Sequence, residues 1–572
     1  MCIVAKKKLL ALFLGLILLL SCFSVFPFVE NGLVSASPDE LKWSKFPTPS
    51  KEHSVVLSSS EINAIALGSD DETFYAIDIP NAKVYKSTDG GVTWPDDIAD
   101  DIIDALSAEG ATLPVWDIAV APDDPDLVAV VTDDRTAVYY SSDGGEEWEA
   151  TPELDLQGTL ISDIAISPEY VERHEERHDI AVGTRNPDSS TNGDILVIRM
   201  LPVHSSDWKT FGDWEAQGLQ VDSTTVGTSA DVTSVCFSPN YAEHKTILAI
   251  ASSAEDLLDS SLQNGTFLCT GIRNTSNNNT DWDVTTPRVI EISETSGDKG
   301  ISIASIAYNN DNGKLLVGGV LADDASSAKA LVRICSNPAD YYPKWEKPSK
   351  PPTGGAVSGC ANAQVAWADG MAYCGTSSSN IASASDWADT DVSSGHPWFG
   401  TGLDESAFSR SDDDGDTWNQ LSLIDTRMSY LCDFALSVDN ETLYLASWGS
   451  GFNSLWRSES ETLGETWQRI LCLASKGEDI ILRFTPEGSP EEAIFFAIVG
   501  TDDARYSLDK GKTWERVWDC PEITDLALVS NEVFYVLDDN LVNKCSWNEE
   551  LWGGIWEWQR DVDTELRHGY SI

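Results

Sequence analysis

The chain of 572 residues carries 93 acidic side chains against 37 Lys and Arg, which gives a formal net charge of −56. A surface with this charge repels the phosphate backbone, so the composition excludes nucleic acid as a partner. The charge is typical of a soluble acidic exterior or of a protein in a crowded extracellular layer.

Residues 1–36 are predicted to be an export signal. A basic end, Lys6 to Lys8, precedes a mostly apolar run over residues 9–29, and Val34-Ser35-Ala36 forms a small-residue cleavage site. Cleavage there makes Ser37 the first residue of the mature protein. Two alternatives stay open: lipidation at Cys22, or an uncleaved anchor, since about 20 apolar residues can span a bilayer. All three place the remaining chain outside the cytoplasm, secreted or attached to the cell surface, with membrane contact only through this segment.

Five segments share the pattern Ser-x-Asp-x-Gly-x-Thr-Trp, at residues 87–94, 141–148, 411–418, 460–467 and 507–514. Each is expected to form a tight hairpin. The Asp accepts hydrogen bonds from N–H groups of the turn, and the Gly takes a backbone conformation that side chains disfavour. The Trp buries its ring at the start of the next strand. The residues assigned to this structural role are Ser87, Asp89, Gly91, Trp94, Ser141, Asp143, Gly145, Trp148, Ser411, Asp413, Gly415, Trp418, Gly464, Trp467, Ser507, Asp509, Gly511 and Trp514.

Two of the five segments depart from the pattern. Thr462 stands in place of Asp in the fourth segment, and Glu147 stands in place of Thr in the second. The motif nevertheless resembles the Asp-box, also called the BNR repeat. In families that carry it, the Asp-box lies on the rim of a β-propeller and away from the active centre. The resemblance therefore implies a propeller fold and a structural role for these residues, and it leaves the activity open.

A second pattern recurs between these segments, an apolar strand that ends in Pro. Its clearest copies are Val115–Pro122, Ile161–Pro168 and Val232–Pro239, and weaker copies begin near Ile62, Ile301, Ala363, Leu431, Ile480 and Ile523. Each copy is followed by a Trp that opens a final strand, which defines nine units. A four-stranded propeller blade takes about 40–50 residues.

The sequence thus predicts an all-β fold, a single β-propeller of about seven to nine four-stranded blades over residues 37–572. The segment Leu41–Pro47 has the composition of a last strand without its blade. We expect it to complete the C-terminal blade, which removes exposed strand edges.

The segment His174-Glu175-Glu176-Arg177-His178 matches the zinc-binding pattern H-E-x-x-H. That chemistry requires a helix that places both His on one face. Here the segment lies in the turn between two predicted strands, and the preceding Val171-Glu172-Arg173 offers no apolar helical face. The context therefore argues against a zinc hydrolase.

Two catalytic families carry Asp-boxes, and neither leaves its signature here. Sialidases have an Arg-Ile-Pro near the start, which this chain lacks. Xyloglucanase-type glycosidases use a pair of Asp residues across a cleft, and such a pair must lie about 5–10 Å apart. Among 93 acidic residues the sequence cannot nominate the pair, so no catalytic residue is assigned.

The most local candidate for ligand binding is a long insertion over residues 377–408. It holds Trp387, His396, Trp398 and Phe399 among Ser, Asp and Gly. Aromatic rings on such a loop can stack on sugars or anchor a protein partner, although they can equally pack back onto the blade. Ca²⁺ is a conceivable ligand, but the acidic run 412–416 lacks the spaced ligands of a calcium loop, so no cofactor is predicted.

Three hypotheses about function remain open, because Asp-box propellers also include sortilin-type receptors and photosystem II assembly factors, which bind partners without catalysis. The first is an exported, non-catalytic cell-surface propeller that binds protein or carbohydrate, or that self-associates as an envelope-layer protein. The second is a glycoside hydrolase acting on extracellular polysaccharide. The third is a carbohydrate-binding lipoprotein.

Overall fold

The computed structural model describes residues 47–560, apart from residues 58–59, 186–192, 201–206, 211–229, 254–265, 275–278, 290–300, 310–312, 325–326, 339–342, 353–361, 369, 378–405, 438–440, 460–463, 476, 487–492, 540 and 549–554. Residues 47–572 form one compact unit. The predicted export signal lies outside the described residues.

The described residues form nine groups of four antiparallel strands, numbered here as sheets 1 to 9. Sheet 1 contains β1 (Ala64–Leu67), β2 (Phe74–Asp78), β3 (Lys83–Ser87) and β4 (Asp96–Asp97), and sheet 2 contains β5 (Val115–Ala121), β6 (Asp124–Thr132), β7 (Val138–Ser141) and β8 (Glu149–Ala150). Sheet 3 contains β9 (Leu160–Ile166), β12 (Asp179–Arg185), β13 (Ile195–Arg199) and β14 (Lys209–Thr210), and sheet 4 contains β15 (Ala230–Phe237), β16 (Thr246–Ser253), β17 (Thr266–Asn274) and β18 (Asn279–Val289). Sheet 5 contains β19 (Ile301–Tyr308), β20 (Leu315–Asp324), β21 (Ser327–Cys335) and β22 (Trp345–Glu346), and sheet 6 contains β23 (Asn362–Ala368), β24 (Met371–Ser377), β25 (Ala407–Ser411) and β26 (Asn419–Ser422).

The remaining three sheets follow in chain order. Sheet 7 contains β27 (Tyr430–Leu436), β28 (Thr442–Gly449), β29 (Phe452–Glu459) and β30 (Gln468–Ala474). Sheet 8 contains β31 (Ile480–Phe484), β32 (Ile494–Ile498), β33 (Ala504–Ser507) and β34 (Glu515–Arg516), and sheet 9 contains β35 (Asp525–Ser530), β36 (Val533–Asp538), β37 (Leu541–Asn548) and β38 (Ile555–Gln559). A single residue pair, Gln420 with Arg469, joins sheets 6 and 7. The first strand of each sheet is called its inner strand.

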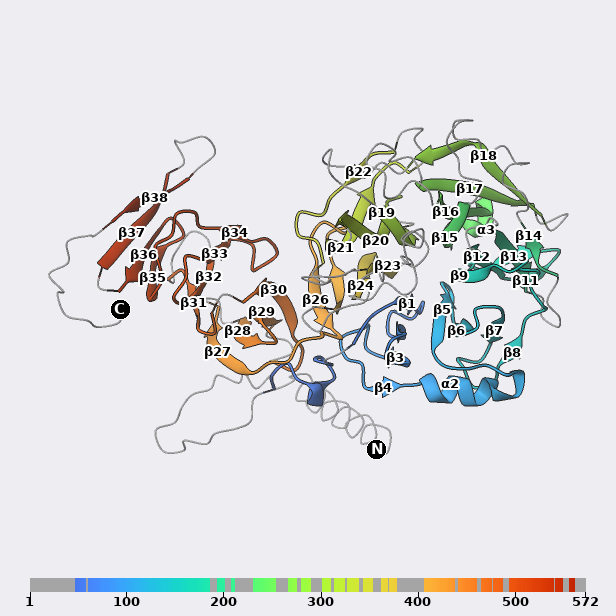
Figure 1. The fold of residues 1–572 in the computed structure, drawn as a ribbon, viewed down its shortest axis with the longest axis horizontal. Helices are drawn as coiled ribbons and strands as arrows, with labels where there is room; N and C mark the ends of the chain where they lie inside the picture. The colour runs from blue at the N-terminus through green and yellow to red at the C-terminus, as the bar shows by residue number, and fades with distance from the viewer. Residues whose placement is uncertain are drawn as a thin grey trace, which may run out of the picture. The chain divides into compact units, whose positions relative to one another are not determined.

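Inner strands of sheets 1 to 6 contact one another in cyclic order: β1 with β5, β5 with β9, β9 with β15, β15 with β19, β19 with β23, and β23 with β1 (Figure 1). The last contact closes the cycle after six sheets, which we call the ring. Because sheet 6 buries its inner strand against sheet 1, sheet 7 has no place in this cycle. The predicted single ring of seven to nine blades is therefore not the arrangement that these contacts describe.

Sheets 7 to 9 form a row, which we call the arc. Inner strand β27 contacts β31, and β31 contacts β35. Sheet 9 takes all four of its strands from residues 525–559. Residues 41–46 lie outside the described residues, so the assignment of Leu41–Pro47 to the outer strand of this sheet stays a prediction. Among the described residues, β38 is the fourth strand of sheet 9.

Aromatic side chains pack the boundary between sheets 6 and 1. Phe408 of β25 lies edge-on to Trp94, with ring centroids 5.1 Å apart, and stacks on Tyr373 at 5.6 Å. Phe74 of β2 meets Tyr373 edge-on at 5.0 Å. All four rings are buried. Large rings contribute much buried apolar area and favourable edge contacts, so these four residues stabilise the closure of the ring.

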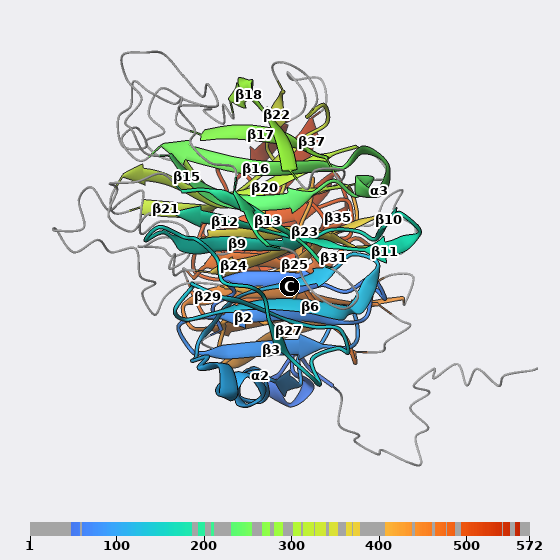
Figure 2. The same ribbon diagram turned by 90° about the vertical axis from the view of Figure 1, so that its right-hand side faces the viewer.

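Helices contribute little. The described residues include α2 (Ala99–Leu106), α3 (Tyr241–His244) and two 3₁₀ turns, η1 (Lys51–His53) and η2 (Ser107–Glu109). Helix α2 buries Ala99, Ile102 and Leu106 and lies beside β3 (Figures 1 and 2). No helix in the described part of the chain combines the length and apolarity needed to cross a membrane.

The Ser-x-Asp segments form compact hairpins after the third strand of their sheets. In the first, Asp89 Oδ1 accepts the Thr93 N–H at 2.8 Å, and Oδ2 accepts the Thr93 hydroxyl at 2.6 Å. Ser87 Oγ accepts the Gly91 N–H at 2.9 Å, and the Trp94 indole N–H donates to the Gly91 carbonyl at 3.2 Å. The same set of bonds recurs at Asp413 and Asp509. Each polar residue of the motif thus satisfies a group of its own turn.

The fourth segment differs from the pattern in its register. Ser458 Oγ accepts the Gly464 N–H at 3.0 Å, the bond that the first serine of the motif makes elsewhere. The turn is therefore two residues longer than in the other segments, and Ser458 takes the role that the pattern gives to Ser460. Trp467 still donates its indole N–H to the Gly464 carbonyl, at 2.7 Å.

Three of the motif glycines lie against the sheet that precedes their own. Gly91 has a φ of +78°, and a Cβ atom there would lie 2.4 Å from a ring carbon of Phe408 in sheet 6. Gly415 approaches Leu316 of sheet 5 in the same way, and Gly511 approaches Ile470 of sheet 7. Two constraints therefore require glycine at position 91, the left-handed backbone conformation and the close contact with Phe408.

Substitution of Gly91 by Ala tests this contact. The left-handed conformation costs Ala about 1–2 kcal/mol, and overpacking against Phe408 adds about 1–3 kcal/mol. Gly110→Ala is a matched control, since Gly110 has a φ of +82° and no atom within 4 Å of the added Cβ. Denaturant unfolding should show a larger loss of stability for Gly91→Ala than for Gly110→Ala. Equal losses would contradict the packing role.

Candidate functional site

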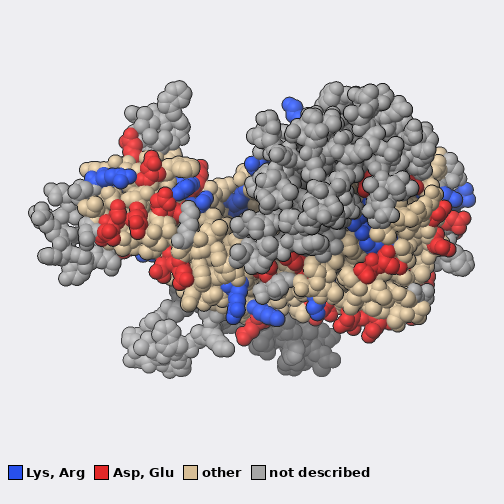
Figure 3. Space-filling model, viewed as in Figure 1, with Lys and Arg blue, Asp and Glu red and all other residues tan. Residues whose placement is uncertain are grey.

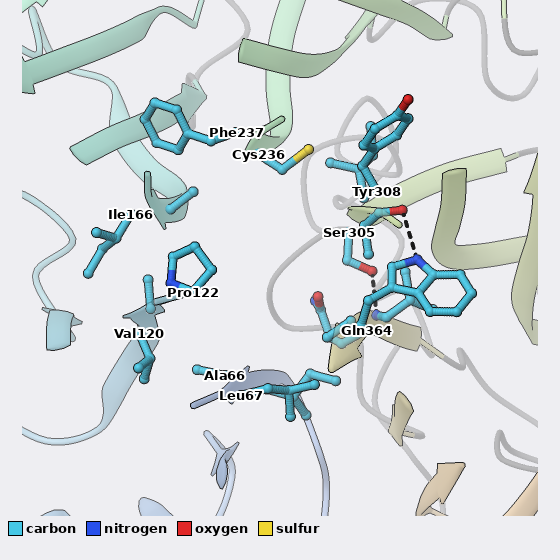
Figure 4. A pocket seen from close by; sticks show the side chains of 18 of the residues that line it. Ala66, Leu67, Val120, Pro122, Ile166, Cys236, Phe237, Ser305, Tyr308 and Gln364 are labelled. Carbon is cyan, nitrogen blue, oxygen red and sulfur yellow. Dashed lines mark hydrogen bonds between the residues drawn. The ribbon is translucent and has the colours of Figure 1, made fainter. Parts of the chain in front are cut away.

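A cavity of about 400 Å³ lies at the centre of the ring. Each of the six inner strands lines it, together with residues that follow the ends of these strands. Figure 4 shows Ala66 and Leu67, Val120, Ile166, Cys236 with Phe237, Ser305 with Tyr308, and Gln364 around this space. Clefts formed where repeated units converge are common ligand sites, and this cavity is therefore the candidate functional site.

Six equivalent positions, one from each inner strand, form a belt around the cavity. They are Ala64, Asp117, Asp163, Ser234, Ser305 and Gln364. Asp163 Oδ2 accepts the N–H of Val235 on the next inner strand at 2.7 Å, and Ser305 Oγ accepts the N–H of Val365 on its neighbour at 2.8 Å. The Asp163 and Ser305 side chains thus each join their own strand to the following one.

The two carboxyl groups of the belt form a pair. Asp117 and Asp163 lie on neighbouring strands and hydrogen-bond to each other. Asp117 also accepts the N–H groups of Ile118 and Ile164. Burial raises the pKa of Asp163 to about 6, and burial together with the neighbouring carboxylate raises the pKa of Asp117 well above its ordinary value. The pair therefore retains a proton to a higher pH than isolated carboxyl groups do.

The wall of the cavity has an apolar part and a polar part. Leu67, Val120 and Ile166 contribute aliphatic surface on one side (Figure 4). Tyr308 and Trp367 lie on the neighbouring inner strands β19 and β23, and the Trp367 indole N–H donates to the Ala307 carbonyl at 3.3 Å. Gln364, Ser305 and Asn309 add polar groups nearby. Aromatic surface with a few fixed polar groups is typical of small-molecule sites.

The residues predicted from the Ser-x-Asp motif do not belong to this site. Within the described residues, the lining comes from the inner strands and the turns that follow them, whereas the motif hairpins follow the third strands. The candidate loop residues Trp387, His396, Trp398 and Phe399 lie outside the described residues.

The H-E-x-x-H segment forms a β-hairpin, in which β10 (Tyr170–Glu172) pairs with β11 (Glu175–Arg177). His174 sits in the turn with a φ of +70°, and His178 Nδ1 contacts the Ser167 carbonyl oxygen at 2.8 Å. A hairpin does not place the two His on one helical face, which agrees with the argument against zinc chemistry. Among the described residues, no group of three potential metal ligands comes together.

Sequence analysis did not identify the belt, although the sequence contains a pattern that points to it. Asp117-Ile118-Ala119 and Asp163-Ile164-Ala165 occupy the same place in two copies of the strand pattern. An Asp in the middle of an apolar inner strand requires buried donors, and this requirement could have pointed to an interstrand contact.

On the face shown in Figure 3, acidic and basic side chains of the described residues are interspersed. Over the whole sequence, Asp and Glu outnumber Lys and Arg.

No family model matches the chain, and no curated protein matches it. Solved structures with detectable similarity include the GH74 xyloglucanase from Xanthomonas campestris, with 13% identity, a TM-score of 0.35, and coverage of 86% of this chain and 79% of the other. YCF48 from Cyanidioschyzon merolae has 13% identity and a TM-score of 0.33, with 73% and 97% coverage. The Cps50 (Swd1) β-propeller domain of Myceliophteria thermophila has 10% identity and a TM-score of 0.31, with 55% and 79% coverage. These similarities are too low to support an argument, so the fold is inferred from the strand pairing within this chain.

The pH dependence of stability tests the carboxyl pair. Because the pKa values in the folded state lie above the ordinary 3.8, the folded protein retains protons that the unfolded chain has released. Folding stability is therefore lost as the pH rises from about 4 through the folded pKa values. Asp117→Asn mimics a protonated Asp117. The stability of this variant relative to the wild type should therefore increase as the pH rises from 5 to 8.

Thermal unfolding at a series of pH values measures this gain. Asp101→Asn, at an exposed position on α2, is the control and should follow the wild-type curve. An Asp117→Asn curve that runs parallel to the wild type would mean that the pair does not share a proton.

Proposed function

We propose that this protein is an exported, non-catalytic β-propeller that acts at the cell surface as a binding or envelope-layer protein, with the central cavity of a six-bladed ring as its ligand site. The observation that carries the proposal is the chemistry of the cavity wall. Aromatic and amide side chains are directed to it, while its carboxyl groups are engaged in holding the strands together.

The geometry of Asp117 and Asp163 supports binding over glycoside hydrolysis. A glycosidase pair stands about 5–10 Å apart, so that a bond or a water fits between the groups. Here the two carboxyl groups hydrogen-bond directly to each other, and their other lone pairs accept backbone N–H groups of Ile118 and Val235. Neither carboxyl group is available to act on opposite sides of a sugar bond.

The proposed ligand is a neutral saccharide end. Tyr308 and Trp367 offer ring surface for a sugar face, and Gln364 and Asn309 offer amide groups for hydroxyls. The strongly acidic exterior disfavours polyanionic ligands. Protein partners at the cell surface remain compatible with the same fold.

A glycan array with the chain from Ser37 onward, combined with an assay for released sugar, tests the proposal. We expect binding without release, and at least a tenfold weaker signal for Tyr308→Ala, the scale of a lost aromatic anchor. Trp518→Ala is the control, because Trp518 is exposed and does not belong to the cavity lining.

Each other outcome has a distinct meaning. Released sugar would overturn the non-catalytic assignment. Binding that survives Tyr308→Ala would exclude the cavity, and Trp387→Ala and Trp398→Ala would then test the loop. The absence of any glycan signal would contradict the saccharide ligand.

A further inference from the structure

The inner strand of sheet 7 presents an apolar surface that the ring does not cover. Tyr430, Leu431, Phe434 and Leu436 of β27 are 43–57% exposed. In the ring, the corresponding strands are flanked by an inner strand on each side. Strand β27 has such a neighbour, β31, on one side only among the described residues.

At the other end of the arc, sheet 9 likewise lacks a neighbouring sheet on one side among the described residues. Its inner strand β35 contacts β31, and no inner strand follows it in the described part of the chain. Phe534 and Val536 are buried toward sheet 8, whereas Ala527, Tyr535 and Leu537 are only partly buried. The arc thus ends in two incompletely covered sheets, one at β27 and one at β35.

The inner strands at the two ends of the arc, β27 and β35, are similar in sequence to the two neighbouring ring strands that carry the carboxyl pair. Asp117-Ile118-Ala119 and Asp163-Ile164-Ala165 stand on neighbouring strands β5 and β9. The arc carries Asp525-Leu526-Ala527 on β35 and Asp433-Phe434-Ala435 on β27, at opposite ends.

The bonds made by these residues match those of the ring in part. Asp433 Oδ2 accepts the N–H of Leu482 on the next inner strand at 2.9 Å, as Asp163 does with Val235 in the ring. Asp525 accepts the N–H of Leu526 at 2.8 Å, as Asp117 accepts that of Ile118. The arc differs in that Arg483 of β31 pairs with both carboxylates, at 3.2 Å from Asp433 and 3.4 Å from Asp525.

The number of sheets in the arc indicates what covers its two exposed ends. The same repeat closes into a ring with six inner strands, and the arc contains three. Two arcs related by a twofold axis supply six, and each would place its β35 against the β27 of the other. Such an isologous arrangement closes without leaving further edges.

We propose that two copies of this chain associate through their arcs, with β35 of each copy packed against β27 of the other, to complete a second six-sheet ring. Phe434 and Leu436 of one copy pack on sheet 9 of the partner copy. The proposal does not depend on the ligand of the central cavity.

Light scattering coupled to size exclusion, with the chain from Ser37 onward at micromolar concentration, measures the oligomeric state. The wild type should have the mass of two chains. Phe434→Asp and Leu436→Asp place a charge on the proposed interface at already exposed positions, and each should weaken dimerisation at least thirtyfold, the scale of a lost interface anchor.

Val171→Asp is the matched control, since Val171 is 67% exposed on the β10–β11 hairpin and should leave the dimer intact. Circular dichroism confirms that the three variants retain the β-fold. A monomeric wild type, an assembly of more than two chains, or a dimer that both Phe434→Asp and Leu436→Asp leave unchanged would each overturn the proposal.

Discussion

The fold depends on a recurrent interaction between neighbouring inner strands, in which a side chain in the middle of one strand accepts an N–H group from the next. Buried backbone N–H groups must find an acceptor, and inner strands of neighbouring sheets do not pair with each other as strands of one sheet do. Asp163 and Ser305 supply that acceptor in the ring, and Asp433 supplies it in the arc. The register between sheets follows from these bonds, and the apolar faces then pack in that register.

This constraint also shapes the chemistry of the central cavity. A carboxyl group that serves as a strand connector is buried, bonded to backbone, and partly protonated when a second one lies beside it. Its raised pKa has a structural cause. A perturbed carboxyl pair in a central cleft would ordinarily suggest catalysis, and the partners of these oxygens are the reason why we propose binding instead.

Much of the fold could be predicted from the sequence because the hairpin motif is local. The bonds of Asp89 and the left-handed conformation of Gly91 follow from the residue types and their spacing. The order in which sheets close could not be predicted, because it depends on contacts such as that of Phe408 with Trp94, which are separated by about 300 residues in the chain. Nine units in sequence are compatible with one ring or with six sheets and three, since each unit looks alike.

The candidate site was less accessible to sequence reasoning. Tyr308 and Trp367 come from different units and lie near each other only because the inner strands of sheets 5 and 6 pack together. The loop aromatics Trp387 and Trp398 drew attention because they cluster in sequence, whereas the aromatic residues of the cavity do not. Sequence proximity thus points to the insertion, whereas the residues of the cavity come together only in the folded ring, at the inner strands.

The closure of the ring after six sheets is the central claim, and a disulfide across its last boundary tests it most directly. A Cβ atom at Gly375 of β24 would lie 3.2 Å from Cβ of Ile62, just before β1, close to the separation of about 3.5–4.5 Å that a disulfide requires. The account predicts that Ile62→Cys combined with Gly375→Cys forms this disulfide in the folded protein, seen by mass spectrometry of peptides before and after reduction. Two free thiols at these positions in the folded, oxidised protein would contradict it, because sheets 1 and 6 would then not be neighbours.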